Sequence, residues 1–185
     1  MNTKYFHRVI KWRRTKNMIK GLVIDNEWCE EPEKVKEEIK NIFRIRFSDD
    51  SNVNVRLDNI GFPLINSEDN NLLISRFSKE EIWEAIWDCD SSKSPGPDGF
   101  NFNFIKQAWD IIKMDILRAV NCFHSCGNWP TGSNASFISL IPKTENPQQL
   151  EEYRPISLIG CIYKIISKIL AKRLQKVIHK IIDQK

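Results

Sequence analysis

The most unusual local sequence of this chain is the segment 93–100, which reads Lys-Ser-Pro-Gly-Pro-Asp-Gly-Phe. Its two prolines fix the backbone angle φ, whereas its two glycines permit φ values or close approaches that other residues do not tolerate. The aspartate can bond to its own backbone and close a turn. Such a stiff loop, with exposed amides, could lie against a phosphate backbone or a partner element. The spacing alone favours a tight inter-helix connection, because the segment matches neither a Walker loop nor a dinucleotide fingerprint. The loop residues in question are Pro95, Gly96, Pro97, Asp98 and Gly99.

Two cations, Lys143 and Arg154, flank a polar loop between two expected strands. Phe137 to Ile141 reads as a strand that ends at Pro142, and a second extended piece covers 154–158. If the two strands pair, both cations project near one rim and could hold phosphate, arginine by its planar fork and lysine as a point charge. Isolated surface cations are the alternative interpretation.

The clearest expected element is a helix over 162–182, with a broad apolar stripe on one face. The stripe consists of Ile162, Ile165, Ile166, Ile169, Leu170, Leu174, Val177, Ile178, Ile181 and Ile182. The other face is expected to present Lys164, Lys168, Lys172, Arg173, Lys176 and Lys180.

Other groups of reactive side chains do not form a recognisable catalytic pattern. Cys122 and Cys126 are one helical turn apart, but no second pair of ligands has a matching spacing, and a structural zinc site usually needs four ligands. The pair Asp49-Asp50 lies in a polar segment and is interpreted as solvated charge, and no serine sits in a nucleophile-elbow context. The sequence therefore predicts no catalytic residue and no metal site.

Composition limits the classes of protein without choosing among them. The 185 residues suit one domain or two small ones. No apolar run approaches the roughly 20 residues of a membrane span, and the basic start lacks the apolar region of a secretory signal, so neither a membrane nor a secreted protein is expected. Five scattered cysteines are expected to be reduced thiols in an intracellular protein.

The charge is unevenly distributed along the chain. The 28 Lys plus Arg residues exceed the 24 Asp plus Glu residues by only four, but residues 1–20 carry seven cations and no acid. Residues 153–185 are also basic, whereas the middle carries most acids. Two basic ends fit contact with a polyanion at separate places, although ordinary solvated charge explains the composition as well.

Local signals predict mostly helices. Residues 22–28 resemble a short hairpin, Pro32 suits the first turn of a helix that reaches Phe47, and Ser78 with Glu81 forms a capping-box pattern. Residues 48–71 look like an irregular connector. A long helical stretch after residue 101 is expected to break near 113–115 and to end at Gly127 and Pro130. The fold class expected is α+β, mostly helical, with a small antiparallel sheet.

Four segments then occur in a characteristic order: KSPGPDG (93–99), LIPK (140–143), YRPISL (153–158) and YKIISKILAKRL (163–174). Together they resemble the N-terminal fingers of a non-LTR, LINE-type retrotransposon reverse transcriptase, most similar to plant examples. Residues 1–28 also resemble the connector that precedes the polymerase in such proteins, so the resemblance covers essentially the whole chain. It implies a basic, helical connector over 1–75 and an incomplete fingers region over 76–185, with palm and thumb absent.

The resemblance also implies roles for particular residues. It places the loop 95–99 near the template, and Lys143 and Arg154 beside the phosphates of the incoming nucleotide or the template backbone. The helix cations Lys164, Lys168, Lys172 and Arg173 would in part face nucleic acid. The implied partners are an RNA template, an RNA–DNA duplex and the missing palm and thumb, in the nucleus or the cytoplasm.

The family catalyses nucleotidyl transfer with two Mg²⁺ ions that palm aspartates hold. The Phe/Tyr-Ala-Asp-Asp motif of that site does not occur in this sequence. We therefore expect a fragment of an RNA-directed DNA polymerase that binds no cofactor of its own and does not polymerise alone. A non-catalytic nucleic-acid-binding module and a polymerase-interaction module are the alternatives.

Overall fold

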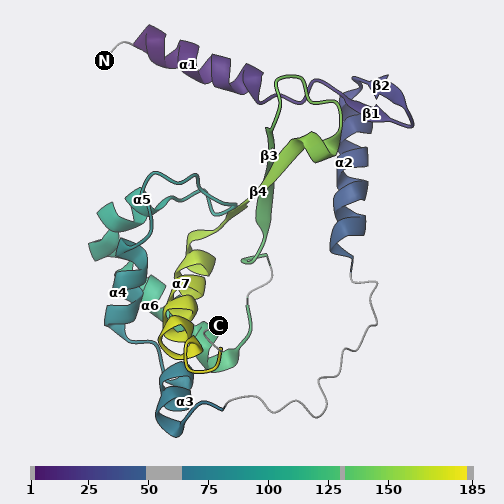
Figure 1. Cartoon of the computed structure of the whole chain (residues 1–185). Helices are drawn as coiled ribbons and strands as arrows, with labels where there is room; N and C mark the ends of the chain where they lie inside the picture. Colours follow the sequence, from purple (N-terminus) through teal and green to yellow (C-terminus); the bar gives the residue numbers. More distant parts are fainter. Residues whose placement is uncertain (1–2, 49–63, 130–131, 183–185) are drawn as a thin grey trace, which may run out of the picture. The chain divides into compact units, whose positions relative to one another are not determined.

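The computed structural model describes residues 3–48, 64–129 and 132–182 (Figure 1). The fold is α+β and mostly helical, with two small two-stranded antiparallel sheets, which confirms the predicted fold class. Within the described residues, no helix has both the length and the apolar character that a membrane crossing requires. The chain forms two compact units: residues 1–56 with 138–156, and residues 57–137 with 157–185. These units are defined by contacts between residues of this chain and do not test its division into polymerase regions. The connector over 1–75 and the fingers over 76–185 therefore stay predictions.

The first unit begins with α1 (Thr3–Lys16), β1 (Leu22–Ile24), β2 (Glu27–Cys29) and α2 (Pro32–Phe47). The predicted hairpin is confirmed, because β1 pairs with β2 in antiparallel register. Asp25 and Asn26 both have positive φ, 52° and 66°, as a two-residue hairpin turn requires. Pro32 lies in the first turn of α2, where its missing N–H costs no hydrogen bond.

The segment 138–156 of the first unit holds most of β3 (Ser136–Pro142) and β4 (Tyr153–Ile159), with a 3₁₀ turn at Leu150–Glu152 between them. The two strands pair, as the sequence predicted. The Val23 amide donates to the Gln148 carbonyl at 2.8 Å, which joins the N-terminal hairpin to the loop between the strands. Leu22, Val35 and Tyr153 form the small core of this unit.

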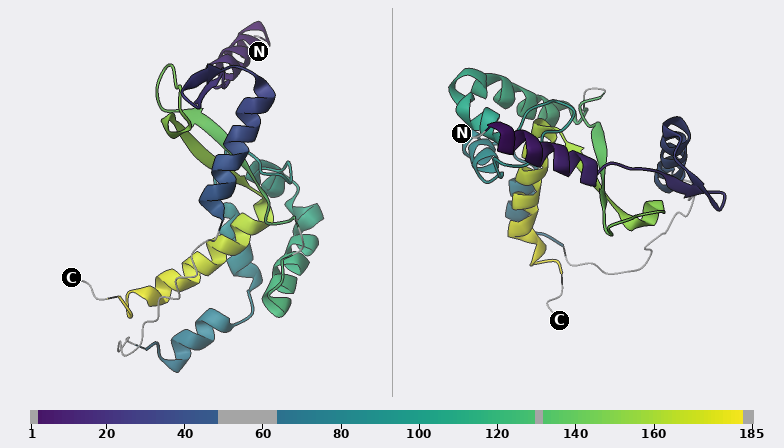
Figure 2. Two further views of the ribbon diagram at one scale, coloured as in Figure 1. Left: turned by 90° about the vertical axis from the view of Figure 1, so that its right-hand side faces the viewer. Right: turned by 90° about the horizontal axis from the view of Figure 1, so that it is seen from above.

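The described residues of the second unit form five helices. Figures 1 and 2 show them from three sides. These helices are α3 (Ser67–Ile74), α4 (Lys79–Trp87), α5 (Phe102–Gln107), α6 (Trp109–Cys126) and α7 (Cys161–Ile178). The capping box is confirmed, because Ser78 and Glu81 exchange hydrogen bonds at the start of α4. The core contains residues from α4, α5, α6 and α7, with Ile82, Ile86, Val120, Ile165 and Ile169 almost fully buried.

Two expectations about the helices are wrong. The first is the extent of the connector to residue 71, because Ser67–Ile74 is a helix whose polar residues form a cap rather than a loop: Asn66 accepts a bond from the Asp69 amide at 2.7 Å. Residues 49–63 of the connector lie outside the described residues.

The expected helix break at residues 113–115 is also wrong, since α6 runs through them. Lys113 pairs with Asp110 and Arg118 with Asp115 at i,i+3, a spacing that supports a helix. The break lies instead at Ala108, whose φ of −89° and ψ of 7° separate α5 from α6. Gly127 ends α6 with a φ of 65°, as predicted, whereas Pro130 lies outside the described residues.

Candidate nucleic-acid interface

The loop between α4 and α5 packs on the turn that precedes α7. Gly96 is buried there, and a Cβ at this position would overlap the carbonyl group of Ile159 and the amide nitrogen of Gly160. The Gly99 amide donates to the Gly96 carbonyl at 3.0 Å, and Gly99 has a φ of +74°. The two glycines therefore serve different purposes: Gly96 allows backbone contact, and Gly99 allows the turn.

Asp98 caps helix α7 from outside that helix. The residue at the N-cap position is Gly160, which has no side chain to accept a bond. The Asp98 carboxylate takes this role, because its Oδ2 accepts a bond from the Cys161 amide at 2.5 Å. A carboxylate at the positive end of an 18-residue helix is favourable electrostatically as well.

Cys161 is enclosed by the same loop. Its thiol is buried and donates to the Phe100 carbonyl at 3.2 Å. Burial, and next the negative charge of Asp98, raise the pKa of the Cys161 thiol to about 12. This cysteine is therefore a packing residue rather than a nucleophile.

These contacts separate the loop residues into two groups. Gly96 and Asp98 contact the start of α7. For these two residues, the loop therefore lies against another element of the same chain, which is one of the two roles that its sequence suggests. Pro95, Pro97 and Gly99 are exposed. Their placement near a template stays a prediction.

Four lysines follow one another at intervals of four along α7, so they form one row on the helix surface: Lys164, Lys168, Lys172 and Lys176. Lys172 pairs with Asp88 at 2.5 Å and with Glu84 at 3.6 Å. The hydrogen bond lowers the pKa of Asp88 and raises that of Lys172. Within the described residues, Lys164, Lys168 and Lys176 form no ion pair, and Lys164 and Lys168 lie closest to the start of α7.

The expectation that Arg173 lies on the exposed basic face is wrong, because its side chain is 2% exposed. Its guanidinium makes a two-pronged pair with Glu81, with both N···O distances 2.8 Å. It also donates to the carbonyls of Leu73, Ser75 and Arg76 and lies 4.6 Å from the centre of the Phe77 ring. Arg173 therefore joins α7 to α4 and to the end of α3.

Lys106 is a further cation with a structural role, which reasoning from the sequence did not identify. Its ammonium donates to the carbonyls of Trp87 and Cys89 at 3.0 and 2.7 Å, and to the Ser91 hydroxyl at 3.1 Å. It thus satisfies carbonyls at the C-terminal end of α4, where a cation is favourable. Lys106 lies 15–19 residues after its three partners, so no local pattern in the sequence indicates this contact.

Lys143 and Arg154 lie at the same end of the β3–β4 hairpin. Lys143 directly follows β3, Arg154 is the second residue of β4, and the Lys143 amide donates to the Glu152 carbonyl at 2.8 Å. The Lys143 ammonium also donates to the Glu151 carbonyl at 2.6 Å, while the Arg154 side chain is exposed. Both residues therefore lie at one end of the hairpin, whereas the projection of both cations toward one rim and their contact with phosphate stay predictions.

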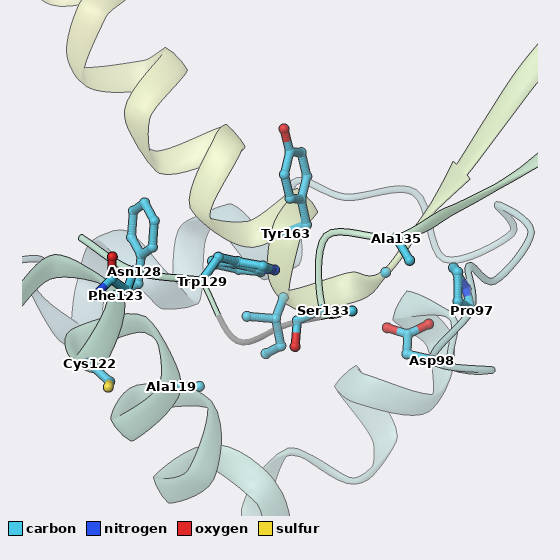
Figure 3. Close-up of a pocket in the computed structure, with 13 residues that line it drawn as sticks. Pro97, Asp98, Ala119, Cys122, Phe123, Asn128, Trp129, Ser133, Ala135 and Tyr163 are labelled. Carbon is cyan, nitrogen blue, oxygen red and sulfur yellow. The ribbon is translucent and has the colours of Figure 1, made fainter. Parts of the chain in front are cut away.

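A pocket of about 460 Å³ lies in the second unit, beside the loop and the start of α7 (Figure 3). The aromatic residues Phe123, Trp129 and Tyr163 line it, together with Asp98 and Ser133. Trp129 contacts the other two rings edge to face, at centroid distances of 5.3 and 5.8 Å. Reasoning from the sequence missed this pocket, because its walls come from three stretches that are distant in sequence, within 97–98, 119–135 and 160–163.

Cys122 also lines the pocket, and its sulfur lies 4.0 Å from that of Cys126. Both thiols are exposed. In the described part of the chain, no three His, Cys, Asp or Glu side chains are grouped so that they could hold a metal ion.

Comparison with known proteins identifies relatives among mobile elements. The chain is 25% identical over 183 residues to the "Transposon TX1 uncharacterized 149 kDa protein" of Xenopus laevis, a match that covers 97% of the chain. It is 33% identical over 103 residues, 52% of the chain, to the "Retrovirus-related Pol polyprotein from type-2 retrotransposable element R2DM" of Drosophila melanogaster. This chain is related to retrotransposon proteins.

The chain spans 14% of the length of the TX1 protein and 10% of the R2DM polyprotein. No family model matches it. The relationship supports the predicted retrotransposon origin, whereas the plant-like character and the fingers assignment stay predictions.

Proposed function

We propose that this chain is the fingers part of a LINE-type reverse transcriptase, which contacts the template and the phosphates of the incoming nucleotide. The similarity to a Pol polyprotein and the order of the four sequence segments support this function. One structural observation carries it: the Pro-Gly-Pro-Asp-Gly loop caps the helix on which Lys164 and Lys168 carry charge that forms no ion pair with a described acid. Two of the four segments thus form one rigid support for cations.

Fixed cations on a helix suit contact with a phosphate backbone. Phosphate contacts position a strand without reading its sequence, as a polymerase requires. Lys143 and Arg154, at one end of the hairpin, supply a point charge and a planar fork for a second set of phosphates.

The proposed chain binds but does not polymerise. The 185 residues contain no Phe/Tyr-Ala-Asp-Asp sequence, so the aspartates that would hold two Mg²⁺ ions are absent from this chain. We expect no primer extension by the purified protein with Mg²⁺ or Mn²⁺, and measurable extension would contradict the proposal.

Binding to an RNA–DNA duplex, measured by fluorescence anisotropy over a series of salt concentrations, tests the proposed contacts. Replacement of both Lys164 and Lys168 by alanine should weaken binding and lower the salt slope by about 0.9 for each phosphate that is no longer neutralised. The matched control replaces Lys79 on α4 and Arg118 on α6, two exposed cations of the same unit outside the row. Equal slopes for both double variants would refute the role of the row.

The hairpin cations need a separate test. The double variant Lys143→Ala with Arg154→Ala should also lower the salt slope, because both side chains lie at one end of the hairpin. Lys40 with Arg44, exposed on α2 of the same unit, is the matched control pair. Unchanged affinity of the hairpin variant would remove these two residues from the interface.

A polymerase-interaction module is the second candidate, and the exposed apolar residues of α7 favour it. Leu170, Leu174 and Ile178 are 38–50% exposed and lie along one side of the helix. Apolar side chains grouped in this way are typical of a surface that another protein covers. Self-association that added salt does not weaken, without duplex binding, would support this candidate over the first.

A further inference from the structure

The pocket in the second unit contains a hydrogen-bond donor without a partner. The indole Nε1 of Trp129 is buried and has no hydrogen-bond acceptor within the described part of the chain. Figure 3 shows the Trp129 indole between Tyr163 and Ser133, two residues that also line the pocket. A buried donor of this kind is unfavourable, at about 1–3 kcal/mol, unless a ligand or water supplies an acceptor.

The charge of the pocket disfavours a phosphate as its occupant. No lysine or arginine is among the described residues that line it, and the Asp98 carboxylate forms part of the wall. A neutral group with both hydrogen-bond donors and acceptors fits this wall better than an anion. The aromatic rings add a preference for a flat group, because Tyr163 is 39% exposed and offers a face for stacking.

We propose that this pocket binds one unpaired nucleobase. A base is flat and neutral, can accept a bond from Trp129, and can donate one toward Asp98. A volume of about 460 Å³ is within the range of small-molecule sites. This inference rests on the proposed function, because a nucleic acid strand bound near α7 would supply the base. Free nucleosides test the pocket without such a strand.

The first experiment measures binding of three RNA–DNA duplexes: one with a single unpaired nucleotide, one with an abasic residue at that position, and one fully paired. The unpaired base should improve affinity about fivefold or more over the abasic residue, because stacking of a base on an aromatic side chain is worth roughly 1–3 kcal/mol. Equal affinities with a normal salt slope would overturn the nucleobase site and leave the proposed function intact.

Two variants then assign the effect to the pocket. Trp129→Phe keeps a ring and removes the unpartnered donor, so it should weaken only the base-dependent binding, by roughly two- to tenfold. Ala119→Leu should block the pocket from the surface of α6, and Ala171→Leu on α7 is its matched control outside the pocket. Loss of base dependence in Ala171→Leu, or its retention in Ala119→Leu, would contradict the assignment.

Alkylation of the two exposed cysteines provides a test that needs no nucleic acid binding. Cys122 lines the pocket and Cys126 does not, so a bound nucleoside should slow iodoacetamide modification of Cys122 at least severalfold more than that of Cys126. Site-resolved mass spectrometry measures both rates in one sample, with adenosine, guanosine, cytidine and uridine as probes. Equal effects on both thiols would overturn the proposal even if no duplex binds. Stronger protection by N-acetyltryptophanamide than by every nucleoside would do the same, since the pocket would then accept a protein side chain.

Discussion

Removal of the Arg173 guanidinium should destabilise the second unit strongly. The variant Arg173→Met keeps an unbranched side chain but removes this donor from three carbonyls and leaves Glu81 with only the bond from the Ser78 amide. Loss of one partner of a buried ion pair typically lowers the free energy of unfolding by about 3–5 kcal/mol. Because Arg173 is 2% exposed and its pair with Glu81 is two-pronged, we expect a loss in this range.

Urea unfolding followed by tryptophan fluorescence measures this loss, since Trp83, Trp87, Trp109 and Trp129 all lie in the second unit. Gln175→Ala, at an exposed position of the same helix, is the control and should change the free energy of unfolding by less than about 0.5 kcal/mol. Arg173→Lys should lie between the two, because it keeps the charge and loses the planar fork. A loss below about 1 kcal/mol for Arg173→Met would refute the view that this network holds the unit together.

The same pair predicts a dependence of stability on pH. The hydrogen bond from Arg173 is the main cause that lowers the pKa of Glu81 below its ordinary value of 4.5. A carboxyl group with a lowered pKa in the folded state stabilises the fold above pH 4.5, and this contribution is lost as the pH falls through the folded-state pKa. Between about pH 6 and pH 3, the unfolding midpoint of the natural protein should therefore fall more than that of Glu81→Gln. Parallel falls would contradict this assignment.

Three further predictions concern the loop and the start of α7. Gly96→Ala should lower the free energy of unfolding by about 1–3 kcal/mol or more, because the new Cβ overlaps backbone atoms. Gly99→Ala should lower it by only about 1–2 kcal/mol, since its Cβ meets open space and only the positive φ is strained. Thermal unfolding that ranks the two variants in the reverse order would refute this packing. Asp98→Ala should cost about 0.5–2 kcal/mol in urea unfolding through loss of the cap, and Asp98→Asn, which keeps an acceptor, should cost less. In the native protein at pH 8, iodoacetamide should modify Cys122 and leave Cys161, whose pKa is about 12, unmodified until the unit unfolds.

The sequence predicts those parts of this fold that depend on neighbouring residues. The hairpin at Asp25-Asn26, the capping box at Ser78 and the end of α6 at Gly127 follow from backbone preferences of single residues. Each of these signals acts within four residues, so no knowledge of the tertiary structure is needed. Polar residues such as Asn66 occur both in helix caps and in loops, so the local sequence does not distinguish the two. For this reason the cap of α3 resembles part of a connector.

The position of Arg173 shows where such reasoning fails. It continues the row Ile165, Ile169, Val177 at intervals of four, and all three of these residues are buried. Spacing alone therefore places it in the core, but a charged side chain is assumed to be exposed unless a partner is known. Its partner Glu81 is 92 residues away in the sequence, and no local pattern connects the two. The pocket walls could not be predicted for the same reason.

The cap formed by Asp98 changes how variants of the Pro-Gly-Pro-Asp-Gly loop must be interpreted. A variant of Gly96 or Asp98 disturbs the support of α7, and with it the position of the lysine row, so weaker nucleic acid binding by such a variant does not show that the loop touches a strand. Asp98 also forms part of the pocket wall, so its loss would affect a bound base as well. Lys164 and Lys168 make no ion pair with other described residues, and their loss leaves the helix cap in place. Direct contact with nucleic acid can therefore be assigned from the lysine row, and the loop can be assigned a contact only by variants that preserve the cap.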